Sequence, residues 1–178
     1  MKQMKFNTAG AHGLLKGYKT QTRRPIKEDT TLLEAAIRMQ NSGTKALAYA
    51  LAYEDLVDKA KYKVGEIVEA VECAHAYVGP EYGESERPFA KIRVVNIRVE
   101  RLRDISEEDA VAEGVPRHML RISRQSHSAA KRFADTIWKP LPYPPEYQWD
   151  ANPWVWVIEV EVVQGEREYI GYTAGPSS

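Results

Sequence analysis

The chain has 178 residues, of which 43% are hydrophobic and 28% are charged, and its formal net charge is zero. A composition of this kind is typical of one globular domain, and it excludes disordered and fibrous proteins. Because the charges balance, no overall field draws the chain to nucleic acid, and any binding of an anion must come from a local cluster of basic residues.

The N-terminal part of the chain combines weak β alternation with one short helical segment. Residues 2–7 are predicted to form a strand, and Thr8 can cap a helix that ends at Gly17. The basic run 19–24, which reads KTQTRR, is predicted to be extended, because the proline that follows disfavours helical geometry in the residue before it. The run suits a charged strand edge, but it also suits the binding of a phosphate or a base edge.

Residues 28–61 differ from their surroundings, since their apolar residues recur at helical spacing. The spacing breaks at Ser42-Gly43, so the segment is predicted to be a pair of helices inserted between strands. The tyrosines at this spacing are more typical of packing than of a platform for stacked bases. The residues that carry the pattern are Leu32, Leu33, Ala36, Ile37, Tyr49, Tyr53, Leu56, Val57 and Ala60.

Two long strands are predicted in the middle of the chain. The first covers residues 67–77, and residues 79–86 are predicted to be an exposed loop because they combine Gly-Pro with acidic side chains. The second strand covers residues 88–103, and its apolar alternation slips by one residue at Val94-Val95. A single slip in a two-residue period predicts a β-bulge.

The chain is then predicted to form two helices. The first begins after Ser106, which can cap it, and ends at Gly114. The second covers residues 123–138, and the prolines within residues 140–145 predict a rigid loop after it.

The last predicted element is a strand over residues 154–162, in which Trp154 and Trp156 are expected to face the core. Residues 164–178 are predicted to be a loosely held tail. Short strands with helices between them, and no regular βαβ alternation, favour an α+β domain with a curved or barrel-like sheet.

Several kinds of site and location are not expected. The chain has one cysteine, Cys73, which excludes an intramolecular disulfide and a cysteine-based zinc site. The four histidines are scattered without a metal-binding spacing, so neither a metal nor a cofactor is expected. No run of signal-peptide character and no stretch of 18 apolar residues occurs, so a membrane span is excluded and the chain is expected to be cytoplasmic.

Four stretches of the chain together resemble a known family. They are residues 15–24 (LKGYKTQTRR), 64–68 (VGEIV), 99–114 (VERLRDISEEDAVAEG) and 152–157 (NPWVWV). In this order they resemble the ASCH domain of the PUA-like superfamily, especially the versions carried by bacteriophages and prophages.

The resemblance covers residues 1–27 and 62–163 and leaves the helical insertion and the tail outside it. It implies one ASCH domain over residues 1–163, with the insertion at 28–61. The implied fold is a small PUA-like β-barrel with packed helices, which agrees with the α+β class expected from the pattern of elements.

The resemblance also implies a cleft that binds RNA, a nucleotide or a modified nucleoside. Some small bacterial members are amidohydrolases that remove the acetyl group from 4-acetylcytidine. The lysine, threonine and glutamate of those enzymes fall by motif position on Lys19, Thr22 and Glu113. A threonine hydroxyl needs a neighbouring base, and a lysine can serve if burial or nearby cations lower its pKa. In a regular strand residues 19 and 22 point to opposite faces, so this triad requires the chain to turn before Thr22.

Other residues are expected to contact the ligand. The resemblance places Arg23 on the same cleft as the triad, with Arg24 or Lys91 near its rim. Trp149 lies next to the proline loop and is the candidate for stacking on a base. Each assignment has a plain structural alternative, such as a surface charge for Lys19 or a solvated helix end for Glu113.

Three functions are consistent with these features. The first is a module that binds RNA or a nucleotide-like ligand through a basic cleft. The second is an amidohydrolase that acts on an N-acylated base. The third is a non-catalytic phage accessory protein that binds a host partner through the helical insertion, with Tyr49, Tyr53 and Leu56 as an exposed patch. The site assignment further predicts that the Lys19 and Glu113 side chains meet within hydrogen-bonding reach.

Overall fold

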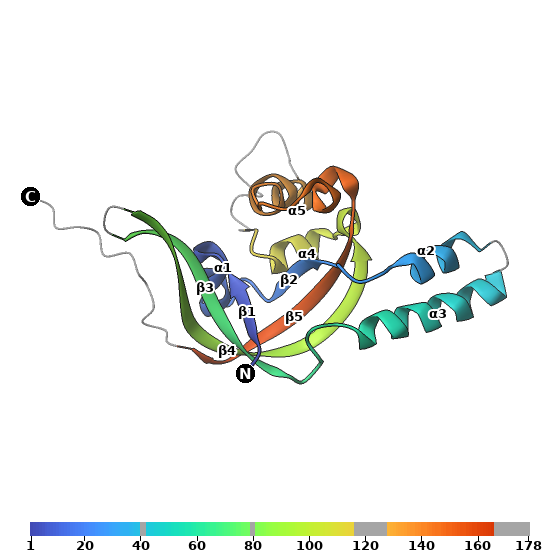
Figure 1. Ribbon diagram of the computed structural model, residues 1–178, viewed down its shortest axis with the longest axis horizontal. Coiled ribbons are helices and arrows are strands. Elements are labelled where there is room, and N and C mark those ends of the chain that lie inside the picture. Colours follow the sequence, from blue (N-terminus) through green and yellow to red (C-terminus); the bar gives the residue numbers. More distant parts are fainter. Residues whose placement is uncertain (40–41, 79–80, 116–127, 166–178) are drawn as a thin grey trace, which may run out of the picture.

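The computed structural model describes residues 1–39, 42–78, 81–115 and 128–165, which form one curled five-stranded sheet with several helices (Figure 1). The strands follow the order β1-β3-β4-β5-β2 across the sheet. β1 and β3 are parallel, and the other neighbouring strands are antiparallel. The bounds of the strands are Gln3–Phe6 for β1, Gln21–Pro25 for β2, Ile67–Val78 for β3, Glu81–Arg101 for β4 and Trp154–Gly165 for β5.

The two edge strands of the sheet approach each other. β1 and β2 are the two ends of the strand order, yet the Arg24 guanidinium donates a hydrogen bond to the Lys5 carbonyl. The same guanidinium lies 5.5 Å from the centroid of the Phe6 ring. The sheet is therefore an incomplete barrel with a seam between β1 and β2, which confirms the expected α+β class with a barrel-like sheet.

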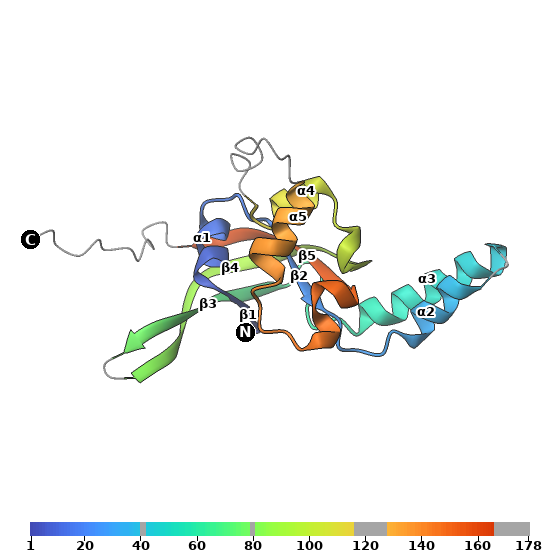
Figure 2. The same ribbon diagram turned by 90° about the horizontal axis from the view of Figure 1, so that it is seen from above.

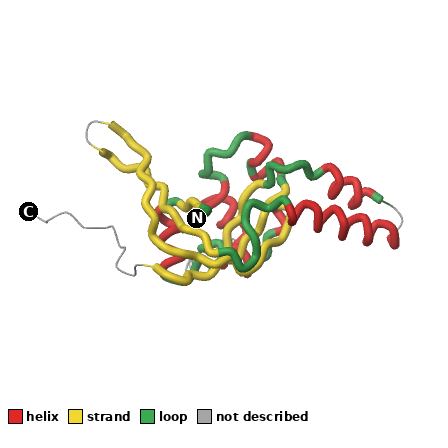
Figure 3. Tube along the Cα trace, turned by 60° about the horizontal axis from the view of Figure 1, so that its bottom comes forward, coloured by secondary structure: helices red, strands yellow, loops and turns green. Residues whose placement is uncertain are grey.

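The longest strand, β4, contains the predicted bulge but begins earlier than predicted. Its register with β5 shifts between Val94 and Asn96, and the intervening Val95 is exposed. The predicted loop over residues 79–86 is wrong for residues 81–86, because these pair with β3 in the hairpin that extends from the sheet in Figure 3. Pairing across the hairpin satisfies the backbone groups of this segment, and this gain depends on β3 rather than on local composition. Residues 79 and 80 lie outside the described residues.

The predicted first helix is present as α1 (Thr8–Leu15). Its cap is Asn7 rather than the predicted Thr8, since the Asn7 side chain accepts a hydrogen bond from the Gly10 N–H at 2.8 Å. Gly17, which follows the helix, has a φ of +76° and lets the chain reverse toward β2.

The helix expected after Ser106 is α4 (Glu107–Ala112), and Ser106 caps it by accepting from the Asp109 N–H at 3.0 Å. α5 (Ala129–Phe133) continues as one π-helical segment, Ala134–Trp138. This pair corresponds to the predicted helix over 123–138, of which residues 123–127 lie outside the described residues. Short 3-10 segments cover Leu102–Asp104, Pro145–Tyr147 and Trp149–Ala151.

The inserted segment forms the predicted helical pair, α2 (Thr31–Arg38) and α3 (Ser42–Asp58), which lie side by side and extend away from the sheet in Figures 1 and 2. Tyr49 and Tyr53 stack on each other with ring centroids 6.0 Å apart, and Leu56 is buried. The Tyr53 hydroxyl also accepts a hydrogen bond from the Val99 N–H at 3.3 Å. These residues therefore join the insertion to the sheet as packing, and they do not form the exposed patch expected of a partner-binding surface.

The strand β5 separates two apolar cores. Trp154 and Trp156 face the core that fills the inside of the curled sheet, as their alternation predicts. Val155 and Val157 face the opposite side, where Phe133 of α5 packs on them. We call these the inner and outer faces of the sheet. The cations of β2 are divided between them.

Candidate functional site

The predicted meeting of Lys19 and Glu113 is confirmed. The Lys19 ammonium donates to Glu113 Oε2 at 2.9 Å and to the Glu113 carbonyl at 2.8 Å. The two side chains are 8% and 3% exposed, so this is a buried ion pair rather than a surface one. Lys19 precedes β2, and Glu113 is the C-cap residue directly after α4. The Thr20 N–H ties the two segments together by donating to the Ala112 carbonyl at 2.9 Å.

The environment of Lys19 alters its acidity. Burial lowers the pKa of the Lys19 ammonium, and Arg24 and Arg23 lower it further, although the carboxylate of Glu113 acts in the opposite direction. Only the neutral form of an amine can accept a proton. A lowered pKa makes this form available at a lower pH than in a solvated lysine. The pair thus has one property that general-base chemistry requires.

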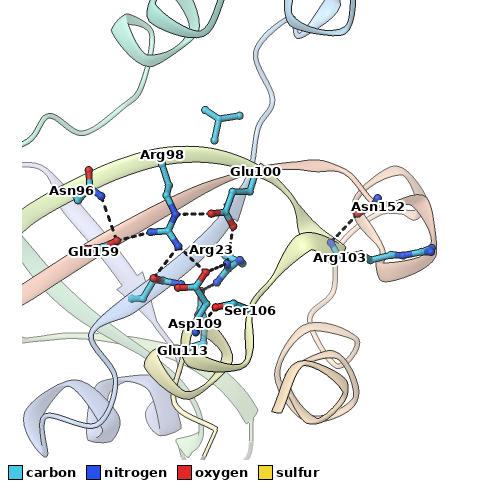
Figure 4. A network of polar contacts seen from close by, with 12 residues as sticks. Arg23, Asn96, Arg98, Glu100, Arg103, Ser106, Asp109, Glu113, Asn152 and Glu159 are labelled. Atoms are coloured by element: carbon cyan, nitrogen blue, oxygen red, sulfur yellow. Dashed lines mark hydrogen bonds and ion pairs between the residues drawn. The ribbon is translucent and has the colours of Figure 1, made fainter. Parts of the chain in front are cut away.

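Arg23 is the centre of a larger group of ion pairs, drawn in Figure 4. Its guanidinium donates to Glu113 at 3.3 Å and to Glu100 and Asp109 at 2.9 Å each. The Arg23 side chain is 1% exposed. The expectation that Arg23 binds the ligand is therefore not supported, because its charge is already satisfied by three carboxylates.

Arg98 of β4 extends the same group. Its guanidinium donates to Asp109 at 2.7 Å and also pairs with Glu100 and Glu159. Burial alone would raise the pKa of Asp109, but hydrogen bonds from Arg23 and Arg98 hold it below its usual value. We call this group the ion cluster, and its members are Lys19, Arg23, Arg98, Glu100, Asp109, Glu113 and Glu159.

The ion cluster contains three cations and four carboxylates, so it is not the basic cleft that the sequence led us to expect. The sequence showed the basic run but could not show which acidic residues would neutralise it. Glu100 of β4 reaches Arg23 across β5 in the sheet, and Asp109 reaches it through the packing of α4 against β2.

Thr22 does not join Lys19 and Glu113. It pairs across strands with Ile158, which faces the inner core, whereas Arg23 pairs with Val157 on the outer face. Side chains that are opposite in an antiparallel ladder share a face, so Thr22 points away from the ion cluster. No hydrogen bond joins Thr22 to Lys19 or Glu113 in the part of the chain that the structure describes. The chain does not turn before Thr22 in the way that the triad requires, and the Thr22 side chain is not directed toward Lys19 and Glu113.

The remaining predicted ligand residues are not members of the ion cluster. Lys91 is exposed on β4 and is paired in register with Glu69 of β3. Trp149 is partly buried, with its ring centroid 6.3 Å from that of Phe133 in an edge-to-face contact, and it belongs to the outer core rather than to a stacking surface. Arg24 lies on the inner face beside the seam.

A cavity of about 810 Å³ lies at the seam, and we call it the seam cavity. Its floor is apolar and includes Ile97, Trp156 and Ile158 from β4 and β5. Five cations and one carboxylate line the cavity, namely Lys2, Lys5, Arg24, Lys27, Lys61 and Glu28. Of the residues predicted to form the ligand site, only Arg24 lines this cavity, which lies on the opposite side of β2 from the ion cluster.

The cations of the seam cavity differ in whether they are already paired. Lys2 pairs with Glu66 and Lys5 with Glu86. Arg24, Lys27 and Lys61 have no carboxylate partner within the described residues. Lys27 lies three residues after Arg24, so its position near Arg24 could have been inferred from the sequence. Lys61 comes from the segment after α3, and no sequence pattern connects it with the other two.

The described ranges contain neither a group of metal ligands nor a membrane-spanning helix. Within residues 1–39, 42–78, 81–115 and 128–165, no three His, Cys, Asp or Glu side chains are grouped so as to hold a metal ion. None of the helices in these ranges is both long and apolar enough to cross a membrane.

Comparison with known proteins found similar structures but no similar sequence. No family model and no curated protein matches the chain. One similar solved structure is a protein from Enterococcus faecalis V583 described with the family model DUF984, with a TM-score of 0.49 and 14% identity over 100% of this chain and 85% of that one. Another is an ASCH domain from Lactobacillus crispatus JV V101, with a TM-score of 0.41 and 11% identity over 92% of this chain and 80% of that one. An ASCH domain is thus among the similar structures, and at these values no residue role is transferred from either protein.

Proposed function

We propose that the chain binds RNA, a nucleotide or a modified nucleoside, and that it does so in the seam cavity. The observation that carries the proposal is the set of three cations, Arg24, Lys27 and Lys61, that line the cavity without a carboxylate partner among the described residues. Unpaired cations beside an apolar floor suit a ligand with an anionic part and a flat hydrophobic part. Nucleotides and single-stranded RNA have this combination.

Binding is tested with a labelled single-stranded oligoribonucleotide and fluorescence polarisation over a range of salt concentrations. Affinity is expected to fall with salt, because phosphate contacts release counterions. Lys27→Ala is expected to weaken binding and to reduce the salt slope by about one unit, since one phosphate contact is lost. Lys16→Ala is the matched control, because Lys16 is an exposed lysine that does not line the cavity. If RNA, nucleotides and nucleosides all fail to bind at low salt, the proposal is wrong.

A second function, hydrolysis of an N-acylated base such as 4-acetylcytidine, is favoured by the Lys19–Glu113 pair. Burial lowers the pKa of Lys19, and its amine is in contact with a carboxylate. Because Thr22 lies across the sheet, the reaction at this pair uses water as the nucleophile. Lys19 takes a proton from water, the water oxygen bonds to the acyl carbon, and the carbon–nitrogen bond breaks. The proton passes to the leaving amine, so the products are cytidine and acetate.

Chromatography of 4-acetylcytidine incubated with the protein tests this second function. Release of cytidine is expected from the wild type and is expected to be lost in Lys19→Met, which keeps most of the buried aliphatic chain but cannot accept a proton. The unfolding temperature of the variant shows whether it is folded under the assay conditions. Absence of product from the wild type, or equal product from a folded Lys19→Met variant, contradicts the role of Lys19.

A further inference from the structure

A contact between β1 and β2 lies at the edge of the seam cavity. Arg24 and Lys5 both line it, and the Arg24 guanidinium donates to the Lys5 carbonyl, so that β2 and β1 are joined at this point. The Arg24 guanidinium also lies on the Phe6 ring, the next residue of β1. The other lining residues near β1, such as Lys2, precede Lys5 in the sequence. Those near β2, such as Lys27, follow Arg24. A nucleic acid strand that enters the cavity therefore cannot continue between β1 and β2 past Arg24.

A second contact lies beside β1. The Tyr62 hydroxyl donates to the Gln3 carbonyl at 2.7 Å, which joins the segment after α3 to β1. Tyr62 is buried, and the Lys61 ammonium lies 5.2 Å from the centroid of its ring. Lys61 is thereby held over one side of the cavity, while Lys27 extends from the segment after β2.

Cross-strand pairing places the side chains of the cavity floor on one face of the sheet. Arg24 is paired across strands with Trp156, and Ile97 is paired with Ile158, so the four side chains share the inner face. Arg24 is therefore the one charged group in this row, beside three apolar ones. A volume of about 810 Å³ lies within the range that holds one small organic ligand.

We infer that the seam cavity holds a single terminal nucleotide, either a free mononucleotide or the phosphorylated end of a single strand, and not the interior of a strand. This inference rests on the proposed function and makes it more specific. The phosphate is bound by Arg24, Lys27 and Lys61, and the base lies on the apolar floor formed by Ile97, Trp156 and Ile158. A terminal phosphate monoester carries more charge than an internal diester, and it suits several cations that lack a carboxylate.

Competition binding against a labelled, 5′-phosphorylated oligouridylate tests the inference. The competitors are uridine 5′-monophosphate, uridine, oligouridylates phosphorylated at the 5′ or the 3′ end, and the same oligouridylate closed into a circle. The phosphorylated linear strands are expected to compete at least tenfold better than the circle, which has no terminus. Uridine 5′-monophosphate is expected to compete better than uridine. Lys61→Ala is expected to reduce the preference for the terminal phosphate, whereas Lys16→Ala leaves it unchanged.

The possible outcomes are distinguishable. A circle that competes as well as the linear strands overturns the inference and leaves the proposed function standing. Failure of the labelled strand and of every competitor to bind contradicts the proposed function itself. If uridine 5′-monophosphate matches the linear strands, the cavity is a site for free nucleotides, and if it is much weaker, the cavity is a site for strand ends. Both of these results support a terminal nucleotide.

Discussion

Replacement of Arg23 with methionine is expected to lower the free energy of unfolding by about 3–5 kcal/mol, which is the typical cost of removing one partner of a buried ion pair. The Arg23 side chain is 1% exposed and contacts Glu100, Asp109 and Glu113. Methionine fills much of the same volume, so the loss comes mainly from buried carboxylates that lose one of their two cations, since Arg98 still pairs with Glu100 and Asp109 and Lys19 still pairs with Glu113. Denaturant unfolding followed by circular dichroism measures the change.

The matched control for Arg23→Met is Arg93→Met. Arg93 pairs with Glu161 on the surface, where the two side chains are 44% and 52% exposed. An exposed pair contributes about 0–1 kcal/mol, because water solvates both charges after the pair is broken. Equal losses of stability in the two variants would contradict the view that the ion cluster is a buried structural unit.

Replacement of Glu113 with leucine is expected to lower the free energy of unfolding by about 3 kcal/mol or more at neutral pH, because it leaves the buried Lys19 ammonium without its carboxylate. A second substitution, Lys19→Met, is expected to recover most of this loss by removing the unpaired charge. The double variant therefore tests the pair directly, since the two effects are not additive when the residues interact.

The loss of stability in Glu113→Leu is expected to depend on pH, and the pKa of Lys19 sets the direction of this dependence. Burial, Arg24 and Arg23 all lower the pKa of the Lys19 ammonium, and Glu113 raises it. The pKa therefore falls further when Glu113 is removed. Between this lowered value and the unfolded value of about 10.4, the unfolded state binds more protons, so stability rises with pH. Because the pKa of Lys19 is lowered in the wild type as well, the loss in Glu113→Leu is expected to shrink as pH rises from the pKa of Lys19 in the variant to its higher pKa in the wild type. A loss that does not change with pH, together with no recovery in the double variant, would show that Lys19 is not the group responsible.

A control for these two variants is Asp55→Leu on α3. Asp55 pairs with Lys59 at 2.7 Å, but both side chains are about half exposed. Its removal is expected to cost less than about 1 kcal/mol and to leave no buried charge behind. The contrast separates the burial of Lys19 from the simple loss of an ion pair.

The sequence by itself determined the elements whose signals are local. Period-two alternation located β5 and the side to which Trp154 and Trp156 point, and a single slip located the bulge at Val95. Ser106 marked the beginning of α4 because a cap is a contact between residues three apart. Strand geometry also indicated that Lys19 and Thr22 would point apart, and in the structure Thr22 lies on the inner face whereas Lys19 contacts Glu113.

Only the tertiary structure decided the chemistry of the basic run. Alternation along β2 sends Arg23 to the outer face and Arg24 to the inner face, but the sequence does not say what each face contains. Three carboxylates from β4 and α4 neutralise Arg23, whereas Arg24 meets no carboxylate of the described residues and lies beside the seam cavity. The charge of a site depends on which distant segments the fold brings within a few ångströms of it, and a local pattern carries no information about those distances. For this reason the basic character predicted for one cleft was found in another.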